Sequence, residues 1–148
     1  MAYKDLPINA SLQEYNRIYK EINKLYREAA QKLGLSNSAF DIFYTICEFE
    51  DGCQQKDICE ATFLPKQTVH SAIHNLEKEG LIVLTPGKGR GVKITLSPLG
   101  EEKIIPLMKP VFKGESASFD AMSPEDAQKL LNLNSQYVSH LRDAFSKI

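Results

Sequence analysis

The chain lacks the features that mark membrane, secreted and enzymatic proteins. In its 148 residues no apolar run approaches the ~20 residues that a membrane-spanning helix needs. The first residues carry a lysine but no apolar signal core, so nothing there suggests export. We therefore expect a soluble protein of the cytoplasm, with no membrane partner.

Motifs that would frame an active site are also missing. The sequence has no Gly-rich phosphate loop, no nucleophile elbow and no HExxH, and its Ser, His and Asp residues are scattered. We therefore predict that the chain is not an enzyme and that it uses no cofactor.

Cysteine is scarce, and its spacing argues against disulfides and zinc. Cys47, Cys53 and Cys59 have no CxxC spacing, and no four-ligand set at zinc-finger spacing occurs. Cys47 falls within an apolar helical pattern, so we expect it to pack in the core. Cys53 and Cys59 flank the start of a short helix, where the pKa of a thiol can be lowered. Reduced thiols are the first interpretation, and a redox role for Cys53 or Cys59 is the second.

A basic excess, common in DNA-binding domains, is absent, because the net charge is −1. The distribution of charge is more informative than its sum. Between Thr85 and Thr95 the chain has three cations, Lys88, Arg90 and Lys93, and no acid. The C-terminal segment balances these cations with Glu101, Glu102, Glu115, Asp120, Glu125 and Asp126. This polarity modestly favours an interaction with DNA through the basic segment.

What the sequence does contain is the order of a helix-turn-helix. A short amphipathic helix is predicted over Gln55–Ala61, and Pro65 suits the first position of a second helix. The apolar residues of the second helix recur at the spacing of one buried face. They are Val69, Ala72, Ile73 and Leu76.

A basic hairpin follows these two helices. The segments Leu81–Thr85 and Val92–Leu96 are rich in β-branched residues and are predicted to be strands. The connection between them is rich in glycine, so we expect an exposed tip. Helix-turn-helix followed by a basic wing is a DNA-binding layout.

Apolar stripes run along both ends of the chain. In residues 8–34 and again in residues 123–148, apolar side chains recur at steps of three and four, as in a heptad seam. A winged helix-turn-helix of ~65 residues has no room in its core for both stripes. We therefore expect the two end helices to pack on each other and on the same pair from a second chain. The residues assigned to this homodimer interface are Leu12, Tyr15, Leu131, Val138, Leu141, Phe145 and Ile148.

The wing and the C-terminal helix are joined by a helix predicted over residues 97–113. Pro106 and Pro110 each remove a backbone donor, so we expect this helix to kink or break. Residues 114–122 are interpreted as a loop. The predicted fold is one domain over residues 1–148, mainly α with a small β hairpin. Its winged helix-turn-helix lobe, residues 36–100, lies between N- and C-terminal dimerisation helices.

Two short motifs carry a family resemblance. The first runs from Gln67–Val69 to Leu76–Ile82, and the second is Val92–Gly100, with a strand and then an "LT..G"-like ending. Together with the order of the predicted helices and strands, these motifs make the chain resemble the MarR-type winged-helix transcription regulators. The resemblance covers the whole chain in architecture, and its specific residues span Asp57 to Gly100. It implies a homodimer with one recognition helix per subunit in consecutive major grooves.

The polar face of the second helix supplies the first set of predicted DNA contacts. Gln67 and Ser71 lie one turn apart, and Gln can bond adenine through two hydrogen bonds. Lys66 and Thr68, near the helix N-terminus, suit phosphate. His70 and His74 have metal-ligand spacing. They lack a nearby carboxylate or cysteine in the sequence, so we expect DNA-facing or solvated side chains and no metal.

The hairpin supplies the second set. A lone arginine in a Gly-rich loop can enter the minor groove, and this is the role predicted for Arg90. Lys88 and Lys93 are expected to contact phosphates.

The resemblance also implies a cleft for small, often aromatic or phenolic effectors. Residues near the first, second and fifth helices suit such a ligand, and a dimer core is the other interpretation of the same set. They are Tyr15, Tyr19, Tyr26, Phe43, Tyr44 and Met108.

The predicted function is that of a sequence-specific double-stranded DNA-binding transcription regulator. We expect a homodimer that represses from a pseudo-palindromic operator and responds to a small effector. The alternative is a winged-helix module that binds proteins, because the fold alone does not guarantee DNA binding.

Overall fold

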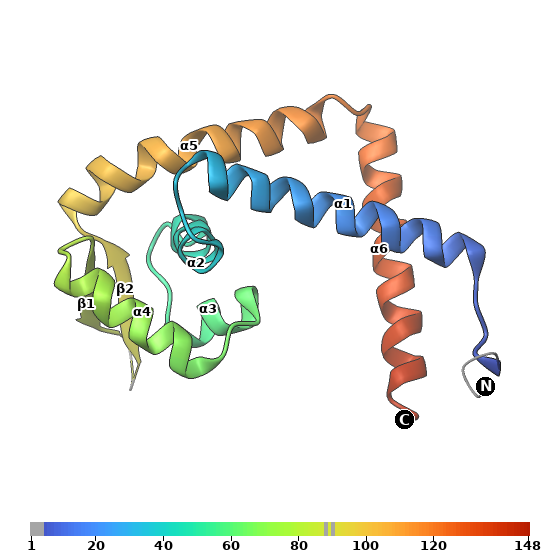
Figure 1. The fold of residues 1–148 in the computed structure, drawn as a ribbon, viewed down its shortest axis with the longest axis horizontal. Helices are drawn as coiled ribbons and strands as arrows, with labels where there is room; N and C mark the ends of the chain where they lie inside the picture. Colours follow the sequence, from blue (N-terminus) through green and yellow to red (C-terminus); the bar gives the residue numbers. More distant parts are fainter. Residues whose placement is uncertain (1–4, 88, 90) are drawn as a thin grey trace. The chain divides into compact units, whose positions relative to one another are not determined.

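The computed structural model describes residues 5–87, 89 and 91–148, and it confirms the predicted fold class (Figure 1). The elements follow in the order α1 (Ala10–Lys32), α2 (Asn37–Glu48), α3 (Gln55–Thr62), α4 (Lys66–Lys78), β1 (Ile82–Pro86), β2 (Val92–Leu96), α5 (Pro98–Asp120) and α6 (Pro124–Phe145). Two compact units divide after Met108. Within the described ranges, no helix is both long and apolar enough to cross a membrane.

Side-chain caps explain where three of the helices begin. The Asn9 side chain accepts a hydrogen bond from the backbone N–H of Leu12 at 3.0 Å, which caps α1. Ser36 caps α2 in the same way, and Ser123 caps α6 by accepting from the N–H of Asp126 at 3.1 Å. These residues satisfy backbone donors that have no partner inside the helix.

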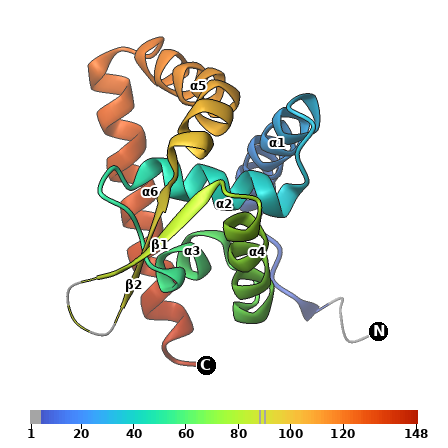
Figure 2. The ribbon, with the colours of Figure 1, turned by 90° about the vertical axis from the view of Figure 1, so that its left-hand side faces the viewer.

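The core of the first unit lies among α2, α3, α4 and the hairpin, which the two ribbon views show gathered into one lobe (Figure 2). α2 packs on α3 and β2, and α4 packs on α3 and β1. The predicted buried face of α4 is confirmed, since Val69 and Ile73 are buried and Ala72 and Leu76 pack beside them. The buried residues of this core are Ile42, Ile46, Cys53, Ile58, Val69, Ile73, Ile82 and Ile94.

The wing is an antiparallel pair in which Ile82 faces Leu96 and Pro86 faces Val92. β2 has the predicted bounds, and β1 starts and ends one residue later than predicted. Cys53 extends the sheet by a single bridge, since its N–H and C=O both bond with Ile94. The link before α3 therefore acts as a short third strand that anchors β2 to the helices.

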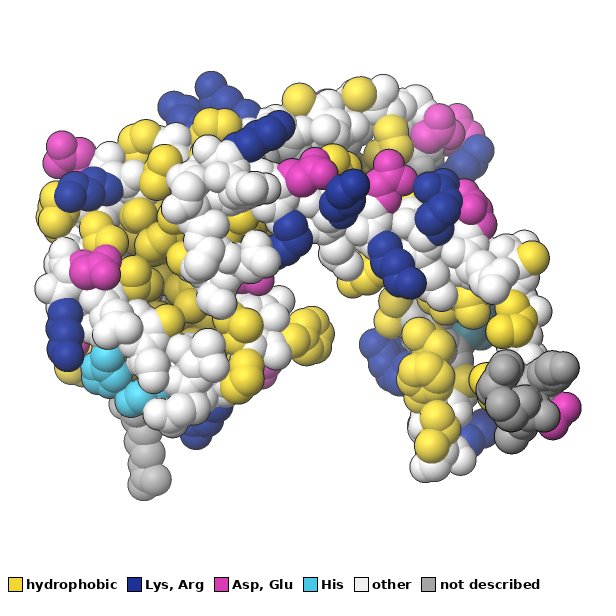
Figure 3. Space-filling view, in the orientation of Figure 1, with side chains coloured by type: hydrophobic (Ala, Val, Ile, Leu, Met, Phe, Trp, Pro, Cys, Tyr) yellow, Lys and Arg dark blue, Asp and Glu magenta, His cyan; other side chains and the backbone are white. Residues whose placement is uncertain are grey.

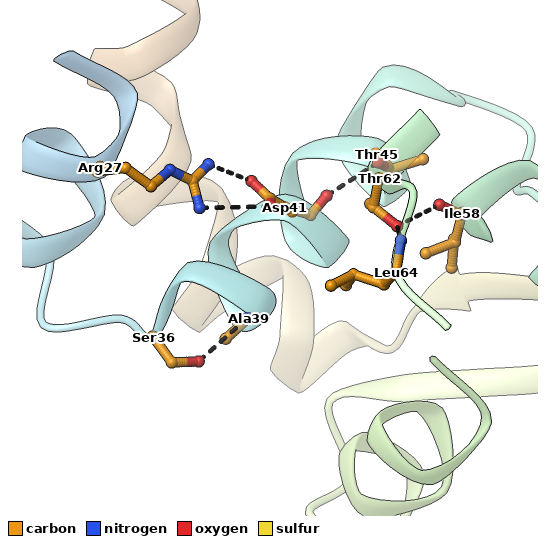
Figure 4. Close-up of polar contacts among 8 residues, drawn as sticks. All are labelled: Arg27, Ser36, Ala39, Asp41, Thr45, Ile58, Thr62 and Leu64. Atoms are coloured by element: carbon orange, nitrogen blue, oxygen red, sulfur yellow. Dashed lines mark hydrogen bonds and ion pairs between the residues drawn. The ribbon is translucent and has the colours of Figure 1, made fainter. Parts of the chain in front are cut away.

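An ion pair and three rings join α1 to α2. Arg27 of α1 reaches Asp41 of α2 through two guanidinium nitrogens (Figure 4). Beside this pair, the ring of Tyr26 meets Phe40 and Tyr44 edge-on at centroid distances of 6.4 and 6.3 Å. These contacts hold the C-terminal half of α1 on the lobe.

The loop predicted for residues 114–122 is wrong, and the connecting helix predicted over 97–113 ends too early. α5 runs to Asp120, with Pro106 and Pro110 inside it. The prediction gave too much weight to Gly114, because one glycine in a helix costs only about 1 kcal/mol. The segment after it holds no further breaker before Ser123 and Pro124, where α6 begins. Ser118 also bonds back to the carbonyl of Gly114 at 2.7 Å, as hydroxyls within helices do.

Candidate nucleic-acid interface

The turn between α3 and α4 is held by backbone contacts of Thr62. Its hydroxyl donates to the carbonyl of Ile58 at 2.7 Å and accepts from the N–H of Leu64 at 3.2 Å (Figure 4). Between them, Phe63 takes the left-handed conformation with φ of 56°. It is 92% exposed, so an aromatic ring stands free at the turn. A non-glycine residue in the left-handed conformation is strained, and it persists only where the surrounding structure holds it. The conformation of this turn is therefore fixed by its neighbours in the lobe.

α4 begins one residue later than predicted. Pro65 precedes the helix with φ of −57° and ψ of 141° and serves as its N-cap residue, and the first helical residue is Lys66. The extended ψ suits a residue that leads into a helix. Proline at this point has no N–H to satisfy.

The face of α4 opposite the core carries the residues predicted to contact DNA. With Val69 and Ile73 buried, the helix turns these side chains to solvent. All of them are exposed: Lys66, Gln67, Thr68, His70, Ser71 and His74. The structure therefore brings the helical set together on one surface.

Two adjoining grooves lie along this face. The first has a volume of about 900 Å³ and is bordered by Lys56 and Glu60 of α3 and by Lys66, Gln67 and His70 of α4. The second, about 410 Å³, continues past His74 to the hairpin residues Leu84, Val92 and Ile94. Figure 3 shows the two histidines of this lobe side by side at its surface. Cationic and amide side chains thus border an open, hollowed surface beside the wing.

The hairpin residues of the predicted set are placed differently. Lys93 is half-buried, and its stem lies so close to Gly52 that a Cβ there would be 2.6 Å from the Lys93 Cε. It alternates with Val92 and Ile94, which border the second groove, so it points to the other face of the hairpin. Lys88 and Arg90 lie outside the described residues.

The α3 side of the grooves was missed by sequence reasoning. Gln55, Lys56 and Glu60 were assigned only to a supporting helix, yet they border the first groove together with α4. Sequence spacing carries no signal for them, because the contacts join residues 11 and 15 positions apart across a turn.

The predicted effector residues divide into three groups. Phe43 and Met108 are buried, with 3% and 1% of their surfaces exposed. Tyr26 and Tyr44 belong to the ring cluster between α1 and α2, whereas Tyr15 and Tyr19 are exposed on α1. Tyr15 and Tyr19 are therefore the solvent-accessible members of the set, and Phe43 and Met108 belong to the buried core.

The residues predicted for a dimer interface are largely uncovered in the single chain. On α1, Leu12 and Tyr15 are exposed, in a row continued by Ile18, Ile22 and Leu25. α6 has no buried residue at all within its bounds. Its exposed predicted residues are Leu131, Val138 and Phe145, with Ile148 just after it, and Leu141 is half-buried.

The environment of the cysteines bears on the redox interpretation. Cys53 is buried, and this burial, with the nearby charge of Asp57, raises the pKa of its thiol to about 11. Burial also raises the pKa of Cys47. A raised pKa keeps the thiol neutral at physiological pH, and the neutral form is the unreactive one.

Slow alkylation of Cys53 is therefore expected. With its pKa raised from 9.0 to about 11, the thiolate fraction at pH 8 falls roughly 100-fold. Alkylation by iodoacetamide, followed by mass spectrometry of peptides, should be at least about 100-fold slower at Cys53 in the folded chain than in urea. The half-buried Cys59 serves as the internal comparison. Equal alkylation rates at Cys53 and Cys59 in the folded chain would contradict the raised pKa of Cys53.

Comparison with known proteins relates the helix-turn-helix segment to one family. Residues 33–91, which contain α2, α3, α4 and β1, match the model of the MarR family. This segment, which holds the helix-turn-helix and the first strand of the wing, is similar to the MarR family.

Individual proteins extend the comparison. NMB1585, a MarR family regulator from Neisseria meningitidis, has the same fold with a TM-score of 0.76 at 24% identity, over 95% of this chain and 99% of that one. The structure of a MepR–DNA complex from S. aureus gives a TM-score of 0.60 at 20% identity, over 91% and 99%. The LexA repressor of Clostridium perfringens is 30% identical over 91 residues. That match spans 61% of this chain but only 44% of the LexA repressor.

Proposed function

We propose that this chain is a sequence-specific double-stranded DNA-binding transcription regulator of the MarR type that acts as a homodimer. The observation that carries the proposal is the exposed face of α4, where side chains of the types that can read bases and bind phosphate lie beside a β hairpin. α4 would enter the major groove, and the grooves bordered by Lys56 and Lys66 would receive the phosphate backbone. The MepR–DNA complex, which has the same fold, supports this mode.

The homodimer is supported by uncovered apolar surface. α6 exposes leucines, a valine and a phenylalanine, and α1 exposes a row of isoleucine, leucine and tyrosine side chains. Large exposed apolar surfaces are rare on monomeric proteins. A two-fold dimer would cover them and present two α4 helices to a pseudo-palindromic operator.

Repression with release by a small molecule is the regulatory mode we propose. The similarity to the LexA repressor supports repression. The ring cluster of Tyr26, Phe40 and Tyr44, with the exposed Tyr15 and Tyr19 earlier on α1, supports an aromatic or phenolic effector. A screen in which phenolic acids fail to release a bound operator would remove this part of the proposal alone.

Salt-dependent binding to duplex DNA separates the proposed function from a protein-binding winged helix. A DNA-binding dimer should be retained on duplex DNA at low salt and lose affinity along a straight line of log K against log salt. A protein adaptor should show little retention at any salt concentration, and this outcome would overturn the proposal.

Removing one phosphate contact should change that slope by a defined amount. Lys66→Ala is expected to weaken operator binding and to reduce the slope by about 0.9 per subunit contact, because one fewer counterion is released. Arg90→Ala in the wing is expected to act in the same direction. Lys103→Ala on α5, outside the grooves, is the control and should leave the slope unchanged. A slope unaffected by Lys66→Ala would exclude that residue from the interface.

A further inference from the structure

An amide from α3 fixes the orientation of one imidazole on α4. The Nε2 of Gln55 donates to the backbone carbonyl of Lys66 at 3.3 Å, and the Oε1 of the same amide lies 3.4 Å from the Nδ1 of His70. A carbonyl oxygen can only accept, so the NH₂ end of the amide must face Lys66. The oxygen end is thereby left for His70.

This arrangement also fixes the position of the imidazole proton. An amide oxygen accepts hydrogen bonds and cannot donate them, so the Nδ1 of His70 must carry the hydrogen. In a neutral ring the Nε2 then has a free lone pair and acts only as an acceptor. The ring of His74 lies edge-to-face with that of His70, at a centroid distance of 4.4 Å, and restricts the ring from the next helical turn.

The free nitrogen is available to a ligand at the interface. His70 is exposed and borders both grooves, and its Nδ1 is occupied on the α3 side. Nε2 lies across the ring from that contact. An acceptor at this place matches the exocyclic amino groups of the major groove, N6 of adenine and N4 of cytosine. It does not match O6 of guanine, O4 of thymine or a phosphate oxygen, which are themselves acceptors.

We propose that Gln55 holds His70 in the Nδ1–H form so that His70 reads an amino-bearing base, adenine or cytosine, at one position of each half-site. The inference rests on the proposed function, since it assigns a base class to one residue of that interface. Gln55 is a positioning residue here, and His70 makes the contact.

The first test measures the tautomer and needs no DNA. Two-bond ¹H–¹⁵N correlation spectra of the ¹⁵N-labelled full chain at pH 8 distinguish a protonated Nδ1 from a protonated Nε2. We expect His70 to show Nδ1–H, and Gln55→Leu to lose that preference because no acceptor remains. Gln31→Leu, the same change at an exposed position of α1, should leave it intact. A predominantly Nε2–H ring in the unmodified chain would overturn the inference whatever the DNA binding.

The second test measures base choice. Duplexes selected from a random pool at pH 8 by the full chain should show one position per half-site that favours adenine or cytosine by about 3- to 10-fold, the effect of one hydrogen bond. His70→Ala and Gln55→Leu should both flatten that position and leave the other positions selective. If duplexes are selected but neither variant alters any position, the inference is wrong while the proposed function stands. If no duplex is selected, the proposed function fails and the inference fails with it.

Discussion

Gly100→Ala is expected to destabilise the protein severely, although alanine is the better helix former. Gly100 is buried in the first turn of α5, and a Cβ there would lie 1.9 Å from the carbonyl oxygen of Leu81. That carbonyl accepts the N–H of Ser97 at 3.0 Å, and the Ser97 hydroxyl in turn accepts from the N–H of Gly100 at 2.9 Å and donates to Gly80. Neither backbone can move away without breaking these bonds.

The expected cost is about 3 kcal/mol or more, from overpacking and from buried polar groups left without partners. Thermal unfolding should show a loss of about 6–12 °C in Tm. Gly114→Ala is the matched control, since it makes the same change in the same helix where no described atom lies within 4 Å of the added Cβ. It should stabilise the chain by about 0.5–1 kcal/mol. Equal effects of the two substitutions would show that the close contact at Leu81 does not exist.

Two aspartates on the apolar side of α6 should abolish dimerisation. Leu131 and Val138 lie two turns apart on one side of the helix and are 49% and 48% exposed in the single chain. If a partner covers them, Leu131→Asp with Val138→Asp would place four unpaired charges in the apolar interface of a two-fold dimer. Self-association should weaken by at least about 100-fold, and operator binding should fall with it.

Sedimentation equilibrium over a range of concentrations measures the change. Gln136→Asp with Ser139→Asp introduces the same charge on the other side of α6, where both residues are exposed, and should leave the dimer intact. If the unmodified chain sediments as a monomer, or if both pairs act alike, the apolar stripe of α6 is not a dimer interface.

The winged helix-turn-helix could be predicted from the sequence because its signals are local. The buried face of α4 follows from the spacing of Val69 and Ile73, and β2 follows from a run of β-branched residues between turn signals. The exposed face of α4 follows from the same periodicity. A prediction of one face of a helix is a prediction of the other.

The wrong helix boundaries came from interpreting single glycine and proline residues as fixed signals for where a helix ends or begins. Gly114 was interpreted as the start of a loop, but helix formation over 23 residues outweighs its local cost, and α5 continues through Pro106 and Pro110 without a break. Pro65 was assigned inside α4 and lies just before it.

The sequence by itself determined the fold class, the polarity of α4 and the family resemblance, because each depends on residues close to one another along the chain. Only the tertiary structure decided that Gln55 meets His70, that the stem of Lys93 lies against Gly52, and that Gly100 must lack a side chain. These contacts join segments separated by a turn, a hairpin or a helix. Their geometry is set by the packing of the lobe as a whole, and no periodicity in the sequence records it.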